Sequence, residues 1–235
     1  MDFRLGCLLA SAATLALGAA SVAQQAAAGQ GKPSSSSSSS PQHVRKAAPT
    51  AGSRLDAGLV SNGMYRNPTL GFTCKIPAGW VLRTEEMNAE SAESHPVAEN
   101  ATKTGQSRDG KVLLAAFSRP PQARGEDVNA SILIAAESVT AYPGLKEAMQ
   151  YMQPLEEVAK AQGFDMDEEP YEIAFGTKTL VRADFHKDVG TRVMQQSTLA
   201  MLARGYAVSI TVIGGTEDDV EDLLDGIEFG GASGK

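Results

Sequence analysis

Apolar and polar residues alternate in the segment that follows residue 64, and this alternation marks the first strands of the fold. Phe72, Cys74 and Ile76 are separated by polar residues, which is the period of a strand with one buried face. Turn signals rich in proline and glycine stand on either side, at 68–71 and 77–79. We expect Cys74 to be an inert core residue, because the pattern places it on the buried face with no base to activate its thiol.

Two later segments are apolar almost without interruption. The stretches 111–118 (KVLLAAFS) and 130–139 (ASILIAAESV) predict strands that are covered on both faces, at the centre of a sheet. Further strands are expected at 65–67, 80–82, 171–175, 177–185, 192–203 and 206–213. Short turns join the last four of these, so they should be antiparallel neighbours.

Helical spacing of apolar residues appears in two places. The first predicted helix covers 145–162, where Pro154 should produce a kink or separate two short helices. The second begins after Thr216, a favourable N-cap, and ends near Gly226. The acidic residues of its first turn are explained by the helix dipole. The polar stretch 87–110 is interpreted as a long loop with room for one helical turn.

These elements predict an α+β domain, an α/β/α sandwich with a central, mostly antiparallel sheet and helices on both faces. The single globular domain is expected to cover 61–231. Residues 1–23 have the apolar centre and small-residue cleavage signal of a signal peptide. Residues 24–60, rich in Ser, Ala, Gly and Pro, should form a disordered linker, and 232–235 a flexible tail. The mature protein is then secreted or periplasmic, with no membrane span after cleavage.

Charge and cysteine content narrow the classes of partner. The chain has 28 acidic and 21 basic residues, a formal net charge of −7. An acidic domain repels phosphate groups, which argues against nucleic acid and against anionic lipid as partners. Of the two cysteines, Cys7 lies in the predicted signal peptide, so we expect no intramolecular disulfide in the mature chain.

A few residues are candidates for binding. The acidic run at 165–169 resembles the opening of a calcium loop, which makes Asp165, Asp167 and Glu169 the candidate metal ligands. The run lacks the glycine and the distal glutamate of such a loop, so a solvated connection is the preferred interpretation. Trp80 and His186 are the candidate binding residues, and the alternative for each is a structural role. No motif for zinc, a nucleotide cofactor or nucleophilic catalysis occurs, so no cofactor is expected.

Three segments together resemble one known group of proteins. They are YRNPTLGFTCKIPAGW at 65–80, ADFHKDVGTRVMQQSTLAMLARGYAVSITVIGG at 183–215 and TEDDVEDLLDGIEF at 216–229. In their order of strand and helix signals they resemble the PsbP-like group, which includes an extrinsic subunit of photosystem II, a Ran-binding import factor and exported bacterial domains. The resemblance implies an α/β/α sandwich that mainly binds other proteins. The resemblance implies no active-site residues for this chain.

Three functions remain open from the sequence. The first is a non-enzymatic exported binding or accessory domain that interacts with an unknown protein in the cell envelope. The second is a carboxylate-dependent hydrolase that pairs Asp184 with an acid of the loop 85–99. The third is a small-ligand or lipid carrier with an apolar cavity lined by Met149 and Met152. Because no catalytic motif is present, we expect the protein not to be an enzyme.

Overall fold

The computed structural model describes residues 55–94, 110–120, 122–123, 125 and 127–230. The predicted signal peptide, the linker up to residue 54 and the C-terminal tail lie outside these residues. The first described strand, β1, begins at Leu59, two residues before the start that was predicted for the domain.

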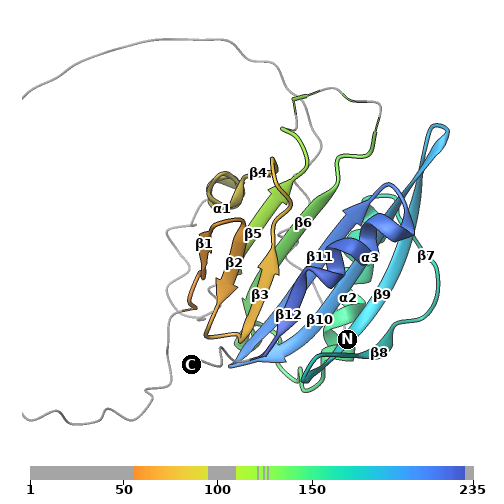
Figure 1. Ribbon diagram of the computed structural model, residues 1–235. Helices are drawn as coiled ribbons and strands as arrows, with labels where there is room; N and C mark the ends of the chain where they lie inside the picture. Colours follow the sequence, from red (N-terminus) through yellow and green to blue (C-terminus); the bar gives the residue numbers. More distant parts are fainter. Residues whose placement is uncertain (1–54, 95–109, 121, 124, 126, 231–235) are drawn as a thin grey trace, which may run out of the picture. The chain divides into compact units, whose positions relative to one another are not determined.

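Most strands belong to one antiparallel sheet of eight strands (Figure 1). Its order is β4-β5-β6-β11-β10-β9-β7, and β8 also pairs with β9. The strands are β4 (Val81–Leu82), β5 (Lys111–Phe117), β6 (Ser131–Ser138), β7 (Asp165–Met166), β8 (Tyr171–Phe175), β9 (Lys178–Val189), β10 (Arg192–Ala203) and β11 (Tyr206–Gly214). Strands β5 and β6 are largely buried, as their continuous apolar sequence predicts. The predicted central position is wrong for β5, because only the two-residue β4 lies beyond it and β5 is therefore near one edge of the sheet. The α+β class and the antiparallel pairing of the last strands are confirmed.

The N-terminal strands form a second sheet, which corrects the prediction of a single central sheet. Its order is β1 (Leu59–Ser61), β2 (Met64–Asn67), β3 (Phe72–Lys75) and β12 (Ile227–Phe229). The C-terminal β12 was not predicted, because three residues after a helix are too few to show a period. It pairs with β3, where the rings of Phe72 and Phe229 lie 5.4 Å apart, so the two ends of the domain are joined in one sheet.

A helix replaces the first part of the predicted polar loop. Helix α1 covers Thr84–Ser94, and the rest of that loop, 95–109, lies outside the described residues. Few apolar residues mark this helix, and tertiary hydrogen bonds hold it instead. Asn88 Nδ2 donates to the carbonyl of Val112 (2.9 Å), and the amide of Val112 donates back to Asn88 Oδ1 (3.0 Å). These bonds to β5 could not be predicted from local sequence.

Helix α2 (Ala148–Ala161) supplies a large part of the core. It runs as one helix through Pro154, so of the two alternatives predicted there, a kink or two short helices, the second is wrong. Tyr151 and Met152 are fully buried in a cluster with Val181 and Phe185 of β9. Burying such side chains stabilises the fold by about 1.5–3 kcal/mol each.

Helix α3 (Glu217–Asp225) begins as the sequence predicts, with the side chain of Thr216 accepting a hydrogen bond from the amide of Asp219 (3.1 Å). It contacts β10 and β11. The approach is close at Gly214, where an added Cβ would lie 2.8 Å from the Cβ of Asp219. A larger residue at this position would push α3 away from the sheet.

None of the helices within the described residues is long and apolar enough to cross a membrane.

Candidate functional site

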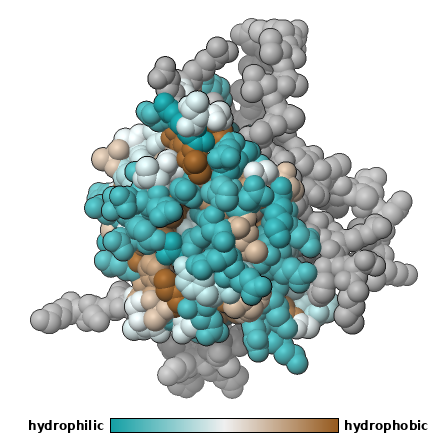
Figure 2. Space-filling model, turned by 90° about the vertical axis from the view of Figure 1, so that its right-hand side faces the viewer, coloured by the Kyte–Doolittle hydropathy of each residue, from teal (hydrophilic) through white to brown (hydrophobic). Residues whose placement is uncertain are grey.

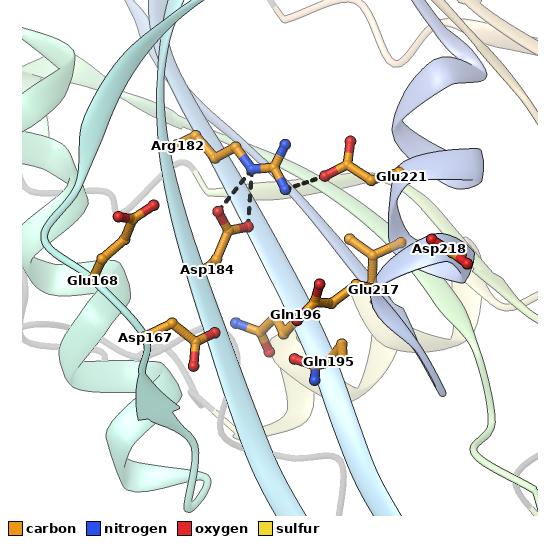
Figure 3. Close-up of a pocket in the computed structure, with 10 residues that line it drawn as sticks. Asp167, Glu168, Arg182, Asp184, Gln195, Gln196, Glu217, Asp218 and Glu221 are labelled. Carbon is orange, nitrogen blue, oxygen red and sulfur yellow. Dashed lines mark hydrogen bonds and ion pairs between the residues drawn. The ribbon is translucent and has the colours of Figure 1, made fainter.

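A hollow of about 320 Å³ lies between α3, the long strands β9 and β10, and the turn after β7, residues 167–170 (Figure 3). Its lining is mostly polar or charged, and one apolar side chain takes part. The lining residues are Asp167, Glu168, Arg182, Asp184, Gln195, Gln196, Glu217, Asp218, Val220 and Glu221. The segments that form the hollow are therefore far apart in sequence.

Arg182 is the central cation of the hollow. Its Nε lies 2.9 Å from both carboxylate oxygens of Asp184, and its Nη2 lies 2.5 Å from Oε1 of Glu221. Arg182 and Asp184 stand two positions apart on β9, so their side chains share one face of the sheet. Burial lowers the pKa of Arg182, but the hydrogen bonds to Glu221 and Asp184 raise it by more, so the pKa lies above its ordinary value. Arg182 therefore stays charged and ties α3 to the sheet.

Tyr171 of β8 completes the surroundings of Asp184. Its hydroxyl donates to Asp184 Oδ2 over 3.0 Å. Burial, followed by the negative charge of Asp184, raises the pKa of Tyr171 to about 12, so the phenol remains a donor at neutral pH. Three donated contacts thus hold Asp184 in one orientation.

The charges of the hollow do not balance. The carboxylates among its lining residues are Asp167, Glu168, Asp184, Glu217, Asp218 and Glu221, and the guanidinium of Arg182 is the cation among them. Arg182 is already bound to two of these acids. The others leave the hollow with an excess of negative charge, and a concave site with such an excess attracts cationic groups.

His186 supports one wall of the hollow. It lies on β9, two positions after Asp184, and its Nδ1 is 2.5 Å from Oδ1 of Asp167. The hydrogen bond to Asp167 raises the pKa of His186, and the charges of Asp167, Asp165 and Asp188 add to this effect. At mildly acidic pH the pair is an ion pair that holds the turn after β7 against β9.

The candidate metal ligands are spread over β7 and the turn after it. Asp165 lies opposite His186 in the pairing of β7 with β9, Asp167 contacts that histidine, and Glu169 is exposed. In the parts of the chain that the structure describes, no three His, Cys, Asp or Glu side chains are grouped so that they could hold a metal ion.

The two candidate binding residues lie far apart. Trp80 is partly buried just before β4, at one side of the large sheet, whereas His186 is on β9 near the other. Trp80 does not line the hollow. Cys74, by contrast, is fully buried on β3 as predicted, and burial raises the pKa of its thiol to about 12. A buried neutral thiol is a poor nucleophile.

The pairing of Asp184 with an acid of the loop 85–99 is wrong for the part of that loop that the structure describes. This part is α1, which contacts β5. The strands β6, β11 and β10 lie between β5 and β9. The acids that do surround Asp184 come from α3 and the turn after β7, and their grouping with Arg182 was not predicted from the sequence. The available signal was the spacing of Arg182, Asp184 and His186 at every second position of a strand.

No family model matches this chain, and no curated protein matches it by sequence. Several solved structures are similar to it. The solution structure of cyanobacterial PsbP (CyanoP) from Synechocystis sp. PCC 6803 is 15% identical, with 71% of this chain and 91% of that chain covered and a TM-score of 0.40.

Two further structures have lower scores. LpqN of Mycobacterium tuberculosis, described as involved in cell envelope biogenesis, is 12% identical, with 66% of this chain and 76% of that chain covered and a TM-score of 0.33. A protein from Bacteroides thetaiotaomicron is 10% identical, with 74% of this chain and 50% of that chain covered and a TM-score of 0.36. The PsbP-like group, which the sequence resembles, is thus represented among the similar structures.

Proposed function

We propose that this protein is a non-enzymatic, exported accessory domain of the cell envelope, and that its hollow receives a cationic group of a partner protein. The observation that carries the proposal is the uncompensated negative charge of the hollow, where the one lining cation, Arg182, already binds Asp184 and Glu221. The export and the envelope location rest on the signal peptide that the sequence predicts.

The finer arrangement of the domain as an α/β/α sandwich belongs to this proposal. Helix α2 packs on Val181, Ala183 and Phe185 of β9, whereas Arg182 of the same strand binds Glu221 of α3. Neighbouring residues of a strand point to opposite faces. The contacts of the two helices with alternate residues of β9 support a sheet with a helix on each side, and the hollow lies on the side of α3.

A protein partner is favoured over an apolar ligand because the surface beside the hollow is hydrophilic. Figure 2 shows the side of the molecule that lies to the right in Figure 1, where β7 and β9 are found, and its hydrophobic areas are small and separate. A lysine or arginine side chain brings one positive charge on an apolar stem, which suits a concave site of this size.

Hydrolysis by Asp184 is less well supported. Both of its oxygens lie 2.9 Å from Arg182 Nε, and Tyr171 donates to one of them. A general base needs a lone pair aimed at the substrate. The contacts of Asp184 favour an anchor for Arg182 instead.

Lipid carriage has no support in the residues that suggested it. Met152 is fully buried in the packed cluster under α2, whereas Met149 is 38% exposed. Neither side chain lines the hollow.

Binding of pentalysine amide at low ionic strength tests the proposed function. The double variant E217Q/D218N removes two charges from the hollow, and D222N/D225N removes two exposed charges from the same helix outside it. We expect the first variant to weaken binding about fivefold or more relative to the second, because only the first changes the local field of the hollow. Equal weakening by the two variants would show general attraction to an acidic protein and would contradict the proposal.

A further inference from the structure

The two edges of the large sheet differ in how their backbone groups are covered. At the β5 side, Asn88 of α1 pairs with both backbone groups of Val112, and the amide of Ala115 donates to the hydroxyl of Thr84 (2.9 Å). The short strand β4 pairs with the remaining end of β5. Side chains and a short strand thus cover the edge of β5, which is a common protection against unwanted strand pairing.

The opposite side has no such cover among the described residues, except at the C-terminal end of β8, where the ring of Phe175 packs against that of Phe229 of β12. There β8 pairs with β9 from Tyr171 to Phe175 and with no other described strand. Glu172 and Ala174 are exposed, and no proline interrupts the strand. An edge strand directs every second N–H and C=O outward, so β8 offers backbone groups that an extended peptide can bind.

This open edge lies directly beside the hollow. Tyr171 contacts Asp184, and Glu168, three residues earlier, lines the hollow. Tyr171 is paired with Arg182, so the two side chains are on the same face of the sheet. A residue of an added strand opposite Tyr171 would point to that face as well, which brings its side chain to the rim of the hollow.

We propose that β8 accepts an extended, basic segment of the partner protein as an additional strand, and that this segment places a lysine or arginine side chain in the hollow. The inference rests on the proposed function and specifies the conformation of the partner. Charge complementarity identifies the occupant, because Glu168, Glu169 and Glu172 flank or belong to the edge. A second copy of this chain would bring the same acids together, and like charges facing each other across strands are unfavourable.

Three peptides test the inference on the mature chain. The first is an acetylated and amidated octapeptide in which lysine alternates with threonine. The second has the same sequence with N-methylated central amides, which keeps the charge and removes the backbone donors. The third has glutamine in place of lysine. Affinity is measured for each peptide, and hydrogen exchange follows the backbone amides of 171–175.

The expected result is that the first peptide binds and slows exchange in β8, whereas N-methylation weakens binding about tenfold or more, since several backbone hydrogen bonds are lost. The glutamine peptide should bind more weakly as well. Equal binding of the methylated peptide would overturn strand addition and leave cation recognition by the hollow intact. Failure of both lysine peptides to bind would overturn both proposals. Protection of β8 without peptide, together with a dimer in solution, would assign the edge to a second copy.

Discussion

Nδ1 of His186 lies 2.5 Å from Oδ1 of Asp167, and this pair joins β9 to the turn after β7. The hydrogen bond to Asp167 raises the pKa of His186 above its ordinary value of 6.5. A histidine whose pKa is raised by folding stabilises the fold fully below its unfolded pKa, and this contribution is lost as the pH rises through the folded pKa. We therefore expect H186N to lower the melting temperature at pH 6 more than at pH 8.

Nuclear magnetic resonance can follow the imidazole of His186 directly, and its signal is assigned by its absence in H186N. In D167N the pKa of His186 should fall towards the ordinary value, because the first cause of the shift is removed. The variant D222N changes an exposed acid of α3 and is the control. An unchanged pKa in D167N would contradict the contact.

The two ion pairs of Arg182 differ in burial, so the loss of each should lower the free energy of unfolding by a different amount. The Arg182 side chain is 12% exposed and that of Asp184 22%, whereas that of Glu221 is 53% exposed. We expect R182M to cost about 1–3 kcal/mol, because it leaves a partly buried carboxylate without its donor. The variant E221Q should cost about 0–1 kcal/mol, as is usual for an exposed pair. Urea unfolding at neutral pH measures both.

A double-mutant cycle separates the pair from simple loss of packing. If R182M and D184N together cost much less than the sum of the single variants, the two side chains interact as the structure describes. Additive costs would mean that the aliphatic part of Arg182 contributes the stability and the charge does not.

Strands were easier to predict than the charged site, and the reason is physical. Alternation in β3 and continuous apolar sequence in β5 and β6 are local consequences of burial. The contact of Arg182 with Glu221 joins residues on separate elements, and no local pattern records it. The acids of α3 had a sufficient local explanation in the helix dipole, so their second role in the hollow was missed. Helix α1 was missed for a similar reason, because Asn88 binds β5 through tertiary contacts.

Cys74 should be unreactive in the folded protein. Its side chain is fully buried, and burial raises its pKa to about 12. In a C7A background, which leaves Cys74 as the one thiol of the chain, a disulfide reagent should react only as fast as the protein unfolds. The variant C74S should cost about 1–3 kcal/mol because it buries a hydroxyl in an apolar site. Rapid labelling at a rate independent of urea would show that β3 exposes its inner face.

Asn88 should be important both for stability and for solubility. Its amide donates to the carbonyl of Val112 and accepts from the amide of Val112, at 2.9 and 3.0 Å, and so takes the place of a neighbouring strand at the edge of β5. The variant N88A leaves both backbone groups without this partner, which we expect to cost about 1–3 kcal/mol in urea unfolding.

The variant N88D separates the two hydrogen bonds of this side chain. Aspartate can still accept from the amide of Val112, but it places a negative charge beside the carbonyl of Val112, so N88D should cost at least as much as N88A. Replacement of the exposed Glu85 by alanine in the same helix is the control.

Because an uncovered edge next to the apolar β5 can pair with other chains, N88A should also aggregate faster on mild heating, as measured by light scattering. If N88A and E85A aggregate at the same rate, the amide of Asn88 stabilises α1 without protecting the edge of the sheet.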